Sequence, residues 1–300
     1  FWRELCPGLS LGGDGAPPPA RLSAVERQVE WLRHEGYVNE PGVLPLEFVR
    51  ALHAGIEQLA ARGIPPAFIY VYDEAWLAFR SLTPFLERVL GADFRLMAGV
   101  WAWHVQPSED DAGWKPHRDG FSASAPAGRL PDAVTIWLPL TDATCLNGCI
   151  YVVPAHWDAV AARPVEHDGD VTLTGRELQN IRALPAPAGS MLGWNHNVLH
   201  WGARASSRAA GPRCSLALMF RRLEEGPEDP SWIRLHTPPG FHRRLGLIGH
   251  YVRLYPQRFG LDRLKQPQLQ ALAAALEWKF WQPMAPRASG DHEHGRPASA

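Results

Sequence analysis

Between residues 94 and 221 the sequence consists of short β-prone runs separated by turn-forming residues. The runs cover residues 94–106, 132–140, 149–154, 170–174, 180–186, 190–194, 197–203 and 213–221. The intervening residues include Asn147-Gly148 and Pro187-Ala188-Gly189, which favour turns because Gly, Asn and Pro suit the dihedral angles of turns. Many short strands at this spacing are typical of a sandwich or barrel of the jelly-roll kind. We therefore expect a mainly β core over residues 93–222.

Apolar residues at helical spacing predict a layer of helices before this core, over residues 22–92. The expected helices cover residues 23–35, 45–61 and 73–90, and the expected short strands cover 37–38 and 68–72. Ser23 and Glu26 have the spacing of a capping box at the first helix, and Asp73 is the expected N-cap of the third. We interpret this layer as a cover for the β core and not as a separate catalytic unit.

After the core the pattern becomes helical again, and residues 223–285 are expected to form a C-terminal extension. Its expected helices lie around residues 240–254 and 267–281. Residues 286–300 are predicted to be a disordered tail, and the His and Glu residues there are interpreted as solvated, without a packed metal site. Together these predictions describe one domain of mixed α+β class, residues 1–285, with flanking helices around a jelly-roll core.

The charge balance argues against several classes of partner. The chain has 31 acidic and 30 basic residues and no long run of either, whereas a non-specific nucleic-acid binder has a basic excess. No uncharged apolar run reaches the roughly 18 residues that a membrane span needs, and no secretory signal pattern opens the sequence. The cysteines lack zinc-finger spacing and are expected to be free thiols of a reducing compartment: Cys6, Cys145, Cys149 and Cys214. We therefore expect a cytoplasmic protein with neither membrane nor nucleic acid as a partner.

His117 and Asp119 form a His-x-Asp motif whose two side chains can bind one metal ion. Side chains of an extended segment alternate between faces, so these two point the same way and the residue between them points the other. A second match, His156-x-Asp158, follows a strand exit, where a capping or structural role is sufficient. The first match is favoured because Gly120 leaves room beside a metal and because an apolar strand follows the next loop.

The third ligand must come from a distant strand, and His200 lies in the strand-like run 197–203. His196 is a rival, because it would face the same side of an extended segment. Two imidazoles and one carboxylate on one face of an iron(II) ion leave positions open for an organic acid and dioxygen. The set His117, Asp119 and His200 therefore predicts a non-haem iron centre.

Arg213 and Ser215 favour His200 over its rival. If residues 197–203 and 213–221 pair as a hairpin, His200 lies directly opposite Arg213, and the two side chains share a face. The planar fork of an arginine fits a carboxylate bidentately, and Ser215 adds a hydroxyl on the same side. This arrangement predicts a clamp for the distal carboxylate of 2-oxoglutarate. The alternative is that Arg213 pairs with a structural Asp or Glu.

With these residues in place, the chain resembles the phytanoyl-CoA dioxygenase family. His117-Arg118-Asp119-Gly120 resembles the metal motif of that family, and residues 135–144 and 147–156 are similar to its central strand pair. His200 and Arg213 match its distal histidine and its cosubstrate arginine. The resemblance extends over residues 30–222 and is strongest over 114–156 and 189–220.

The resemblance implies a double-stranded β-helix fold, Fe(II) as cofactor, 2-oxoglutarate as cosubstrate and O2, with succinate and CO2 as coproducts. Gln106 stands where the family often has a lysine, and we expect it to reach the inner carboxylate of the cosubstrate. Trp201-Gly202 follows the distal His200, where the family more often has a small residue and a serine. Ser215 is therefore the expected helper of Arg213.

The expected reaction is hydroxylation of a partly apolar small molecule. Asp119 favours hydroxylation over halogenation, because iron halogenases usually lack this carboxylate; desaturation, epoxidation and ring closure stay open. The expected pocket residues, for which plain core packing is an equally good interpretation, are Trp103, Trp114, Phe121, Trp137, Trp194 and Trp201. The alternative function is a cupin-like protein that binds a metal or ligand without oxygenase turnover. Such a protein has no need of Arg213, so this residue separates the two hypotheses.

Overall fold

The structure is a computed structural model that describes residues 1–12, 15–120, 129–158, 173–223 and 232–256. Several predicted features lie outside the described residues. They are Phe121, residues 170–172 of one expected strand, the expected helix 267–281 and the expected tail 286–300 with its His and Glu residues.

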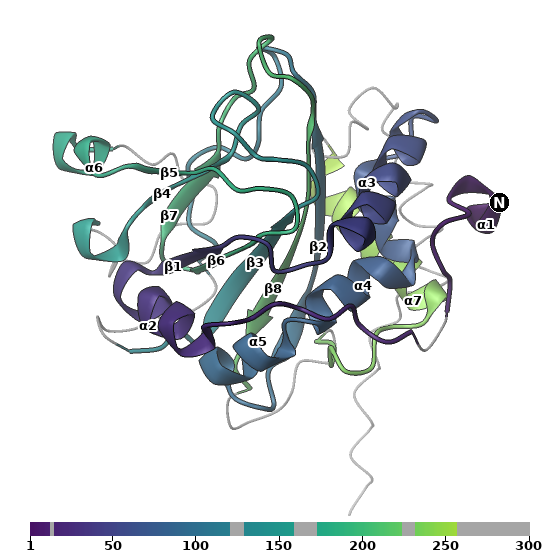
Figure 1. Cartoon of the computed structure of the whole chain (residues 1–300), viewed down its shortest axis with the longest axis horizontal. Coiled ribbons are helices and arrows are strands. Elements are labelled where there is room, and N and C mark those ends of the chain that lie inside the picture. The colour runs from purple at the N-terminus through teal and green to yellow at the C-terminus, as the bar shows by residue number, and fades with distance from the viewer. Residues whose placement is uncertain (13–14, 121–128, 159–172, 224–231, 257–300) are drawn as a thin grey trace, which may run out of the picture.

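Two antiparallel sheets form the core (Figure 1). The larger sheet has the order β1 (Tyr37–Glu40), β6 (Met191–Asn195), β3 (Ala133–Pro139), β8 (Arg213–Arg221) and β2 (Arg95–Val105). The smaller sheet has the order β5 (Arg182–Leu184), β4 (Ile150–Val153) and β7 (Leu199–Gly202). This is the double-stranded β-helix core with flanking helices that the sequence predicts, so the expected α+β class is confirmed.

The interior strand β8 is largely apolar because it is buried on both faces. Successive side chains of a strand point to opposite faces, and both faces of β8 are covered. Leu216 and Leu218 point to the helical side and join the main apolar core. Arg213 and Ala217 point the other way, into the space between the two sheets, where Ala217 packs with Trp137 of β3.

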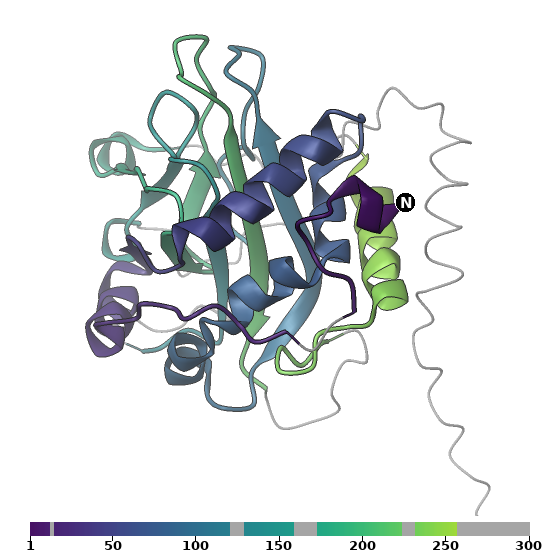
Figure 2. The ribbon, with the colours of Figure 1, turned by 45° about the vertical axis from the view of Figure 1, so that its right-hand side comes forward.

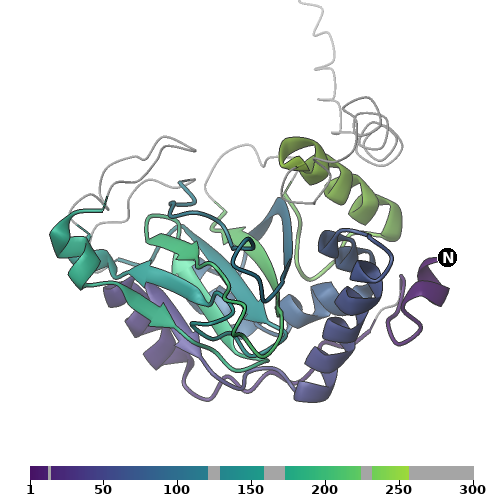
Figure 3. The same cartoon turned by 90° about the horizontal axis from the view of Figure 1, so that it is seen from above.

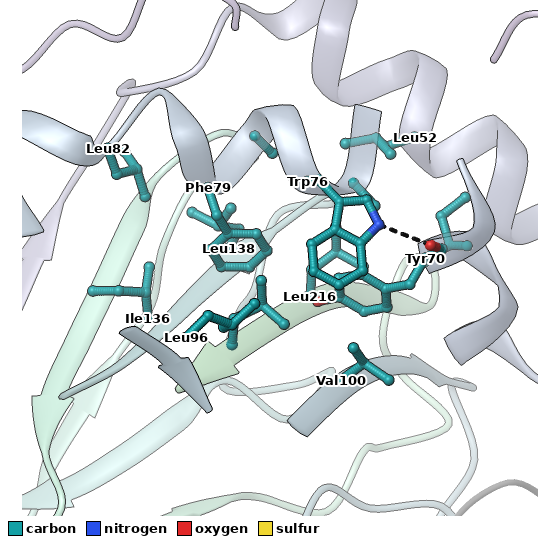
Figure 4. Packing of buried hydrophobic residues seen from close by; sticks show 14 of the residues in the cluster. Leu52, Tyr70, Trp76, Phe79, Leu82, Leu96, Val100, Ile136, Leu138 and Leu216 are labelled. Atoms are coloured by element: carbon teal, nitrogen blue, oxygen red, sulfur yellow. Dashed lines mark hydrogen bonds between the residues drawn. The ribbon is translucent and has the colours of Figure 1, made fainter. Parts of the chain in front are cut away.

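Helices cover the outer face of the larger sheet (Figure 2). They are α3 (Leu46–Ala60), α4 (Asp73–Arg80) and α5 (Thr83–Leu90), whereas α7 (Phe241–Leu254) lies beside the edge strand β2. Figure 4 shows Trp76 and Phe79 of α4 packed against strand residues such as Leu216. Burial of each large apolar side chain contributes roughly 1.5–3 kcal/mol, so this layer holds the larger sheet rigidly behind the space between the sheets.

The remaining elements lie around this framework, as Figure 3 shows from above. They are α1 (Trp2–Leu5), α2 (Val25–Glu35), the 3-10 helices η1 (Pro66–Val71) and η2 (Ala155–Trp157), and α6 (Gly175–Gln179). Within the described part of the chain, no helix combines the length and the apolar character that a membrane span requires.

Residues 68–72 do not form the expected strand. They lie in and just after η1, which begins after Pro65 with Pro66 at its first position. Tyr70 is fully buried; its carbonyl accepts from Trp76 Nε1 at 2.8 Å, and its hydroxyl donates to Ala217 O at 3.1 Å. A continuous apolar run looks the same in a buried strand and in a buried 3-10 turn, because only tertiary contacts distinguish them.

The expected helix caps are also wrong. Ser23 does not cap α2, whose N-cap is Ala24 without a side-chain hydrogen bond, and Glu26 pairs with Arg88 across to α5 at 2.7 Å. The helix expected over residues 73–90 is two helices, because Pro84 starts α5 anew. Asp73 is not a cap; its buried carboxylate belongs to an ion pair described below.

The expected hairpin between residues 197–203 and 213–221 does not exist. After β7 the chain crosses from the smaller to the larger sheet, so β7 pairs with β4 while β8 lies between β3 and β2. His200 is therefore opposite Val152 of β4, and Arg213 is opposite Val105 of β2. Turn residues predicted the break but could not reveal that the two strands enter different sheets.

Candidate active site

The His-x-Asp motif lies alongside β7, although residues 112–120 belong to no named strand. Reciprocal hydrogen bonds of 3.0 Å join the backbones of His117 and His200, and Gly202 N donates to Trp114 O at 3.1 Å. This antiparallel bridge sets the two imidazoles side by side, with ring centroids 4.2 Å apart. Local backbone pairing therefore brings together two residues that are far apart in the sequence.

Two glycines allow this close approach. A Cβ on Gly113 would lie 2.6 Å from the Gly202 Cα, and a Cβ on Gly202 would lie 2.8 Å from the Gly113 Cα. Real Cβ atoms essentially never come so near to backbone atoms, so a side chain at either position would separate the motif from β7. Gly202, which departs from the family pattern in sequence, thus has a steric reason to be glycine.

The ligand atoms of His117, Asp119 and His200 all lie within 4.8 Å of one another. Asp119 Oδ1 is 3.5 Å from His117 Nε2 and 3.7 Å from His200 Nε2. These atoms converge on one point from one side, which is the facial arrangement that leaves other positions of a metal open. The donor set therefore fits a divalent iron ion, and the structure brings together the three residues that the sequence selects.

Neighbouring groups orient each of the three ligands. His117 Nδ1 lies 2.7 Å from Lys115 O, and His200 Nδ1 lies 3.0 Å from Val198 O. Because a carbonyl can only accept, each Nδ1 carries the proton and each Nε2 keeps its lone pair for a metal. The oxygen of the aspartate that faces away, Asp119 Oδ2, accepts from Thr135 Oγ1 at 2.6 Å and from Trp194 Nε1 at 3.0 Å. The site is thus preorganised to receive a cation.

The electrostatics favour the protonation states that bind metal. Burial raises the pKa of the Asp119 carboxyl, but the imidazoles of His200 and His117 outweigh burial and hold the pKa well below its usual range. Burial, with His117 alongside, lowers the pKa of His200 to about 3. Near neutral pH an ionised carboxylate therefore stands beside a neutral imidazole, as metal binding requires.

The rival histidines do not complete a triad. His196 is fully buried, and burial lowers the pKa of its ring. His156 Nδ1 lies 3.7 Å from Glu35 on α2, whereas Asp158 forms a buried ion pair with Arg118. The second His-x-Asp match is therefore divided between two structural contacts, which is the role that its position after a strand suggests.

Arg213 lines the same cavity as the triad, although it comes from the opposite sheet. It is 1% exposed, its guanidinium lies 5.6 Å from the Trp137 ring centroid, and Nη1 donates to Ser215 Oγ at 2.9 Å. Its Nε has no hydrogen-bond partner, and no carboxylate among the described residues forms an ion pair with it. Burial lowers the pKa of Arg213 only to about 10, so the group stays charged at neutral pH. A buried cation without a protein counter-ion fits the carboxylate of a ligand.

The cavity between the sheets has a volume of about 110 Å³, whereas one water molecule needs roughly 10–15 Å³ of such space. It therefore has room for a small dicarboxylate. Four of the expected aromatic residues line it: Trp103, Trp114, Trp137 and Trp194. Trp201 does not line it, because its ring is stacked on Tyr151 at 5.8 Å. Gln106 is also wrong as a cavity residue; it is exposed, and its amide lies 3.2 Å from His104 Nδ1 on the helical side.

Sequence reasoning missed one wall of the cavity. Trp101, two residues before Trp103 on β2, faces the same way and could have been found by strand alternation. Tyr251 and Tyr255 come from α7 and its end, and their rings lie 5.2 and 5.0 Å from Trp101. Helical periodicity predicted α7 but carried no signal for where it packs, so these tyrosines could not be foreseen.

Comparisons with known proteins agree with this fold. Residues 76–213 match the family model described as phytanoyl-CoA dioxygenase (PhyH). The crystal structure of the non-heme alpha ketoglutarate dependent epimerase SnoN from nogalamycin biosynthesis is 23% identical, covering 67% of this chain and 81% of that chain with a TM-score of 0.51. The carbocyclase SnoK is 21% identical, with coverage of 69% and 87% and a TM-score of 0.52.

A further similar structure, the apo form of the non-heme monooxygenase ThoJ, is 15% identical, covers 78% of this chain and 97% of that chain, and has a TM-score of 0.55. No curated protein matches the sequence. At these identities the solved structures establish the shared fold, and the segment that matches the family model carries His117, Asp119, His200 and Arg213. Over residues 76–213, therefore, this chain is similar to the phytanoyl-CoA dioxygenase (PhyH) family.

Proposed function

We propose that this protein is an Fe(II)- and 2-oxoglutarate-dependent oxygenase that hydroxylates a C–H bond of a partly apolar small molecule. The observation that carries the proposal is Arg213, a buried guanidinium without a carboxylate partner among the described residues, in the same cavity as a preorganised His-Asp-His set. A protein that only bound a metal would gain nothing from an uncompensated buried charge there, because such a charge is costly to desolvate.

His117, Asp119 and His200 would hold the iron. With the keto acid bound, the iron supplies the activation of O2 and couples decarboxylation of 2-oxoglutarate to oxidation of the substrate, releasing succinate and CO2. Thr135 and Trp194 fix Asp119 by hydrogen bonds of 2.6 and 3.0 Å, so that its other oxygen stays directed at the metal position. The protein thereby presents one rigid coordinating face and leaves the opposite face to ligands.

Arg213 and Ser215 would bind the distal carboxylate of 2-oxoglutarate. The Nε atom of Arg213 has no hydrogen-bond partner in the part of the chain that the structure describes, and Ser215 Oγ, which accepts from Nη1 at 2.9 Å, has a hydroxyl proton to donate to a carboxylate. Trp137 lies under the guanidinium at 5.6 Å and limits its rotation. A dicarboxylate held at one end by this clamp reaches the metal with its other end, which explains why clamp and triad share one cavity.

An aromatic wall supports a partly apolar substrate. Trp101 stacks on Trp103 with ring centroids 5.9 Å apart and meets Trp114 edge-on at 5.4 Å, while Tyr251 and Tyr255 close the wall from α7. Trp114 in turn lies 5.8 Å from the His117 ring, so the wall begins beside a metal ligand. A flat or ring-containing molecule resting on this wall would present a C–H bond to the metal face from which water is excluded.

The similar solved structures support this class of chemistry and leave several outcomes for the substrate. One structure is of SnoN in complex with Fe3+, alpha ketoglutarate and nogalamycin RO, and other similar structures are of a carbocyclase and a monooxygenase. Hydroxylation, epimerisation and ring closure differ in what replaces the hydrogen removed from the substrate. Product mass distinguishes them: a gain of one oxygen indicates hydroxylation, an unchanged mass epimerisation, and a loss of two hydrogens ring closure.

A spectroscopic titration separates the oxygenase from a cupin-like binding protein. Anaerobic Fe(II) and 2-oxoglutarate should give a weak visible metal-to-ligand charge-transfer band in the wild type and no band in Asp119→Ala. The wild type should then release succinate with one member of a screen of small-molecule classes. The mass of the product formed from that compound identifies the reaction. Absence of the band in the wild type would favour the cupin-like alternative.

A further inference from the structure

A second group of metal-binding side chains lies on the helical side of the larger sheet, away from the cavity. His53 and Glu57 are one turn apart on α3, and they face His104 of β2 and Cys214 of β8. His104 and Cys214 are direct cross-strand partners, so they share a face of the sheet. We call these four residues the α3 cluster.

Three of the side chains converge on one carboxylate oxygen of the fourth, Glu57. Glu57 Oε1 lies 3.2 Å from His53 Nε2, 3.0 Å from His104 Nε2 and 3.9 Å from Cys214 Sγ. The ligand atoms of His53, Glu57 and Cys214 all lie within 4.8 Å of one another. In a tetrahedral zinc site with bonds of about 2.0–2.3 Å, ligand atoms are roughly 3.3–3.8 Å apart. His53, Glu57 and Cys214 can therefore share one ion, whereas His104 lies outside this group of three and must move closer to the other two residues to become a fourth ligand.

The donor types also match zinc. Imidazole, carboxylate and thiolate are each ligand types that Zn²⁺ accepts, and thiolate with imidazole disfavours Mg²⁺ and Ca²⁺. Cys214 is fully buried, whereas His53 and Glu57 are 33% and 44% exposed, so an ion can enter from the helix side. An ordinary helical His-Glu pair lacks these features.

We propose that His53, Glu57, His104 and Cys214 bind a structural zinc ion that ties α3 to the outer face of the larger sheet. Binding converts the Cys214 thiol to a thiolate and releases its proton to solvent. His104 Nε2 becomes a ligand, and its Nδ1–H donates to the side-chain carbonyl of Gln106, whose amide nitrogen now lies 3.2 Å from that atom and must turn around.

The site lies behind the carboxylate clamp. Cys214 stands between Arg213 and Ser215 on β8; Arg213 lines the cavity and is hydrogen-bonded to Ser215, while Cys214 points to α3. An ion bound to Cys214 therefore fixes the segment of β8 that holds the clamp, without touching any ligand in the cavity. The proposal does not depend on oxygenase activity, since it concerns the opposite face of the sheet.

Cobalt(II) tests the site without interference from the triad. Cobalt replaces zinc and gives a near-ultraviolet charge-transfer band only where a thiolate binds it, and the triad contains no sulfur. The full-length wild type should show this band, and Cys214→Ser should lose it. His53→Ala, a change at a half-exposed position that leaves the core intact, should weaken the cobalt affinity at least about tenfold.

Two variants serve as matched controls. His34→Ala removes a histidine from another helical pair, 2.8 Å from Glu30 at the same spacing, and should leave the band unchanged. Cys145→Ser removes an exposed thiol and should also leave it unchanged. Absence of the band in the wild type, its survival in Cys214→Ser, an unchanged affinity in His53→Ala, or its loss in Cys145→Ser would each overturn the proposal.

Discussion

The buried arginine of the helical layer has a carboxylate partner, whereas the buried arginine of the cavity has none among the described residues. Arg244, on the buried side of α7, is 4% exposed, and its Nη1 lies 2.7 Å from the buried Asp73 carboxylate. The carbonyls of Pro239 and Val71 accept further hydrogen bonds from its guanidinium. In the cavity, Arg213 is equally buried, but its only hydrogen-bond partner among the described residues is the hydroxyl of Ser215. The difference indicates that Arg244 stabilises the fold, whereas Arg213 can bind an anion from outside the chain.

Removing the partner of Arg244 should have the largest effect. Asp73→Ala leaves the guanidinium buried without its counter-ion, which costs about 3–5 kcal/mol of unfolding free energy. Urea unfolding should show a lower midpoint with an unchanged slope. The paired replacement Asp73→Leu with Arg244→Met should lose much less, because no charge is then left alone. If the free energy of unfolding of Asp73→Ala falls by less than about 1 kcal/mol, the ion pair does not stabilise the fold and the contrast between Arg244 and Arg213 is wrong.

Replacing Arg213 should act on binding and hardly on folding. Arg213→Met removes one partner of a buried charge pair, so 2-oxoglutarate should bind about 30-fold or more weakly, corresponding to 2–5 kcal/mol. The unfolding midpoint without ligand should stay near that of the wild type or rise, since a buried uncompensated charge is removed. Arg208→Met, at an exposed arginine of the same β7–β8 connection, should change neither quantity. A large loss of stability in Arg213→Met would mean that its role is structural.

Loosening the aspartate ligand should have an intermediate effect. Thr135→Val removes the 2.6 Å hydrogen bond to Asp119 Oδ2 while keeping the shape of the side chain. Because partners of metal ligands typically contribute 10–100-fold to metal affinity, Fe(II) binding should weaken by about that factor, measured anaerobically by competition with a chelator. Trp194→Phe, which removes the other hydrogen bond, should act in the same direction. Unchanged iron affinity in both variants would contradict the preorganised site.

The smallest effect is expected at Ser215. Ser215→Ala removes one hydroxyl from the clamp but leaves the guanidinium, so the affinity for 2-oxoglutarate should fall by only about 0.5–1.5 kcal/mol, a few-fold to about tenfold. Calorimetric titration in the presence of iron measures this change. A loss as great as that of Arg213→Met would place the recognition of the carboxylate on the hydroxyl rather than on the guanidinium.

Local patterns in the sequence predicted the features that depend on residues close together in the chain. Strand alternation placed His117 and Asp119 on one face, and short β-prone runs between turns predicted the strands of both sheets. The convergence of His200 and Arg213 was also predicted, but for the wrong reason. A direct hairpin was expected, whereas the two residues face each other from different sheets, because partner choice in a sheet depends on contacts far apart in the chain.

Other features had no local signal. The segment that forms η1 has the same apolar pattern as a buried strand, and the tyrosines of α7 gave no indication that their helix would pack against the cavity. The Asp73–Arg244 pair joins two helices that are far apart in the sequence, so Asp73 looked like a helix cap. Each of these outcomes depends on tertiary packing that overrides local preference.

The most direct test of the account compares two keto acids that differ only at the far end. 2-Oxoglutarate has a distal carboxylate, and 2-oxopentanoate has a methyl group in its place, so the ratio of their affinities for the anaerobic Fe(II) protein reports on recognition of that carboxylate. We predict that the wild type prefers 2-oxoglutarate by about 30-fold or more and that Arg213→Met loses this preference except for the few-fold share of Ser215. Equal affinities in the wild type, or an undiminished preference in Arg213→Met, would contradict the account.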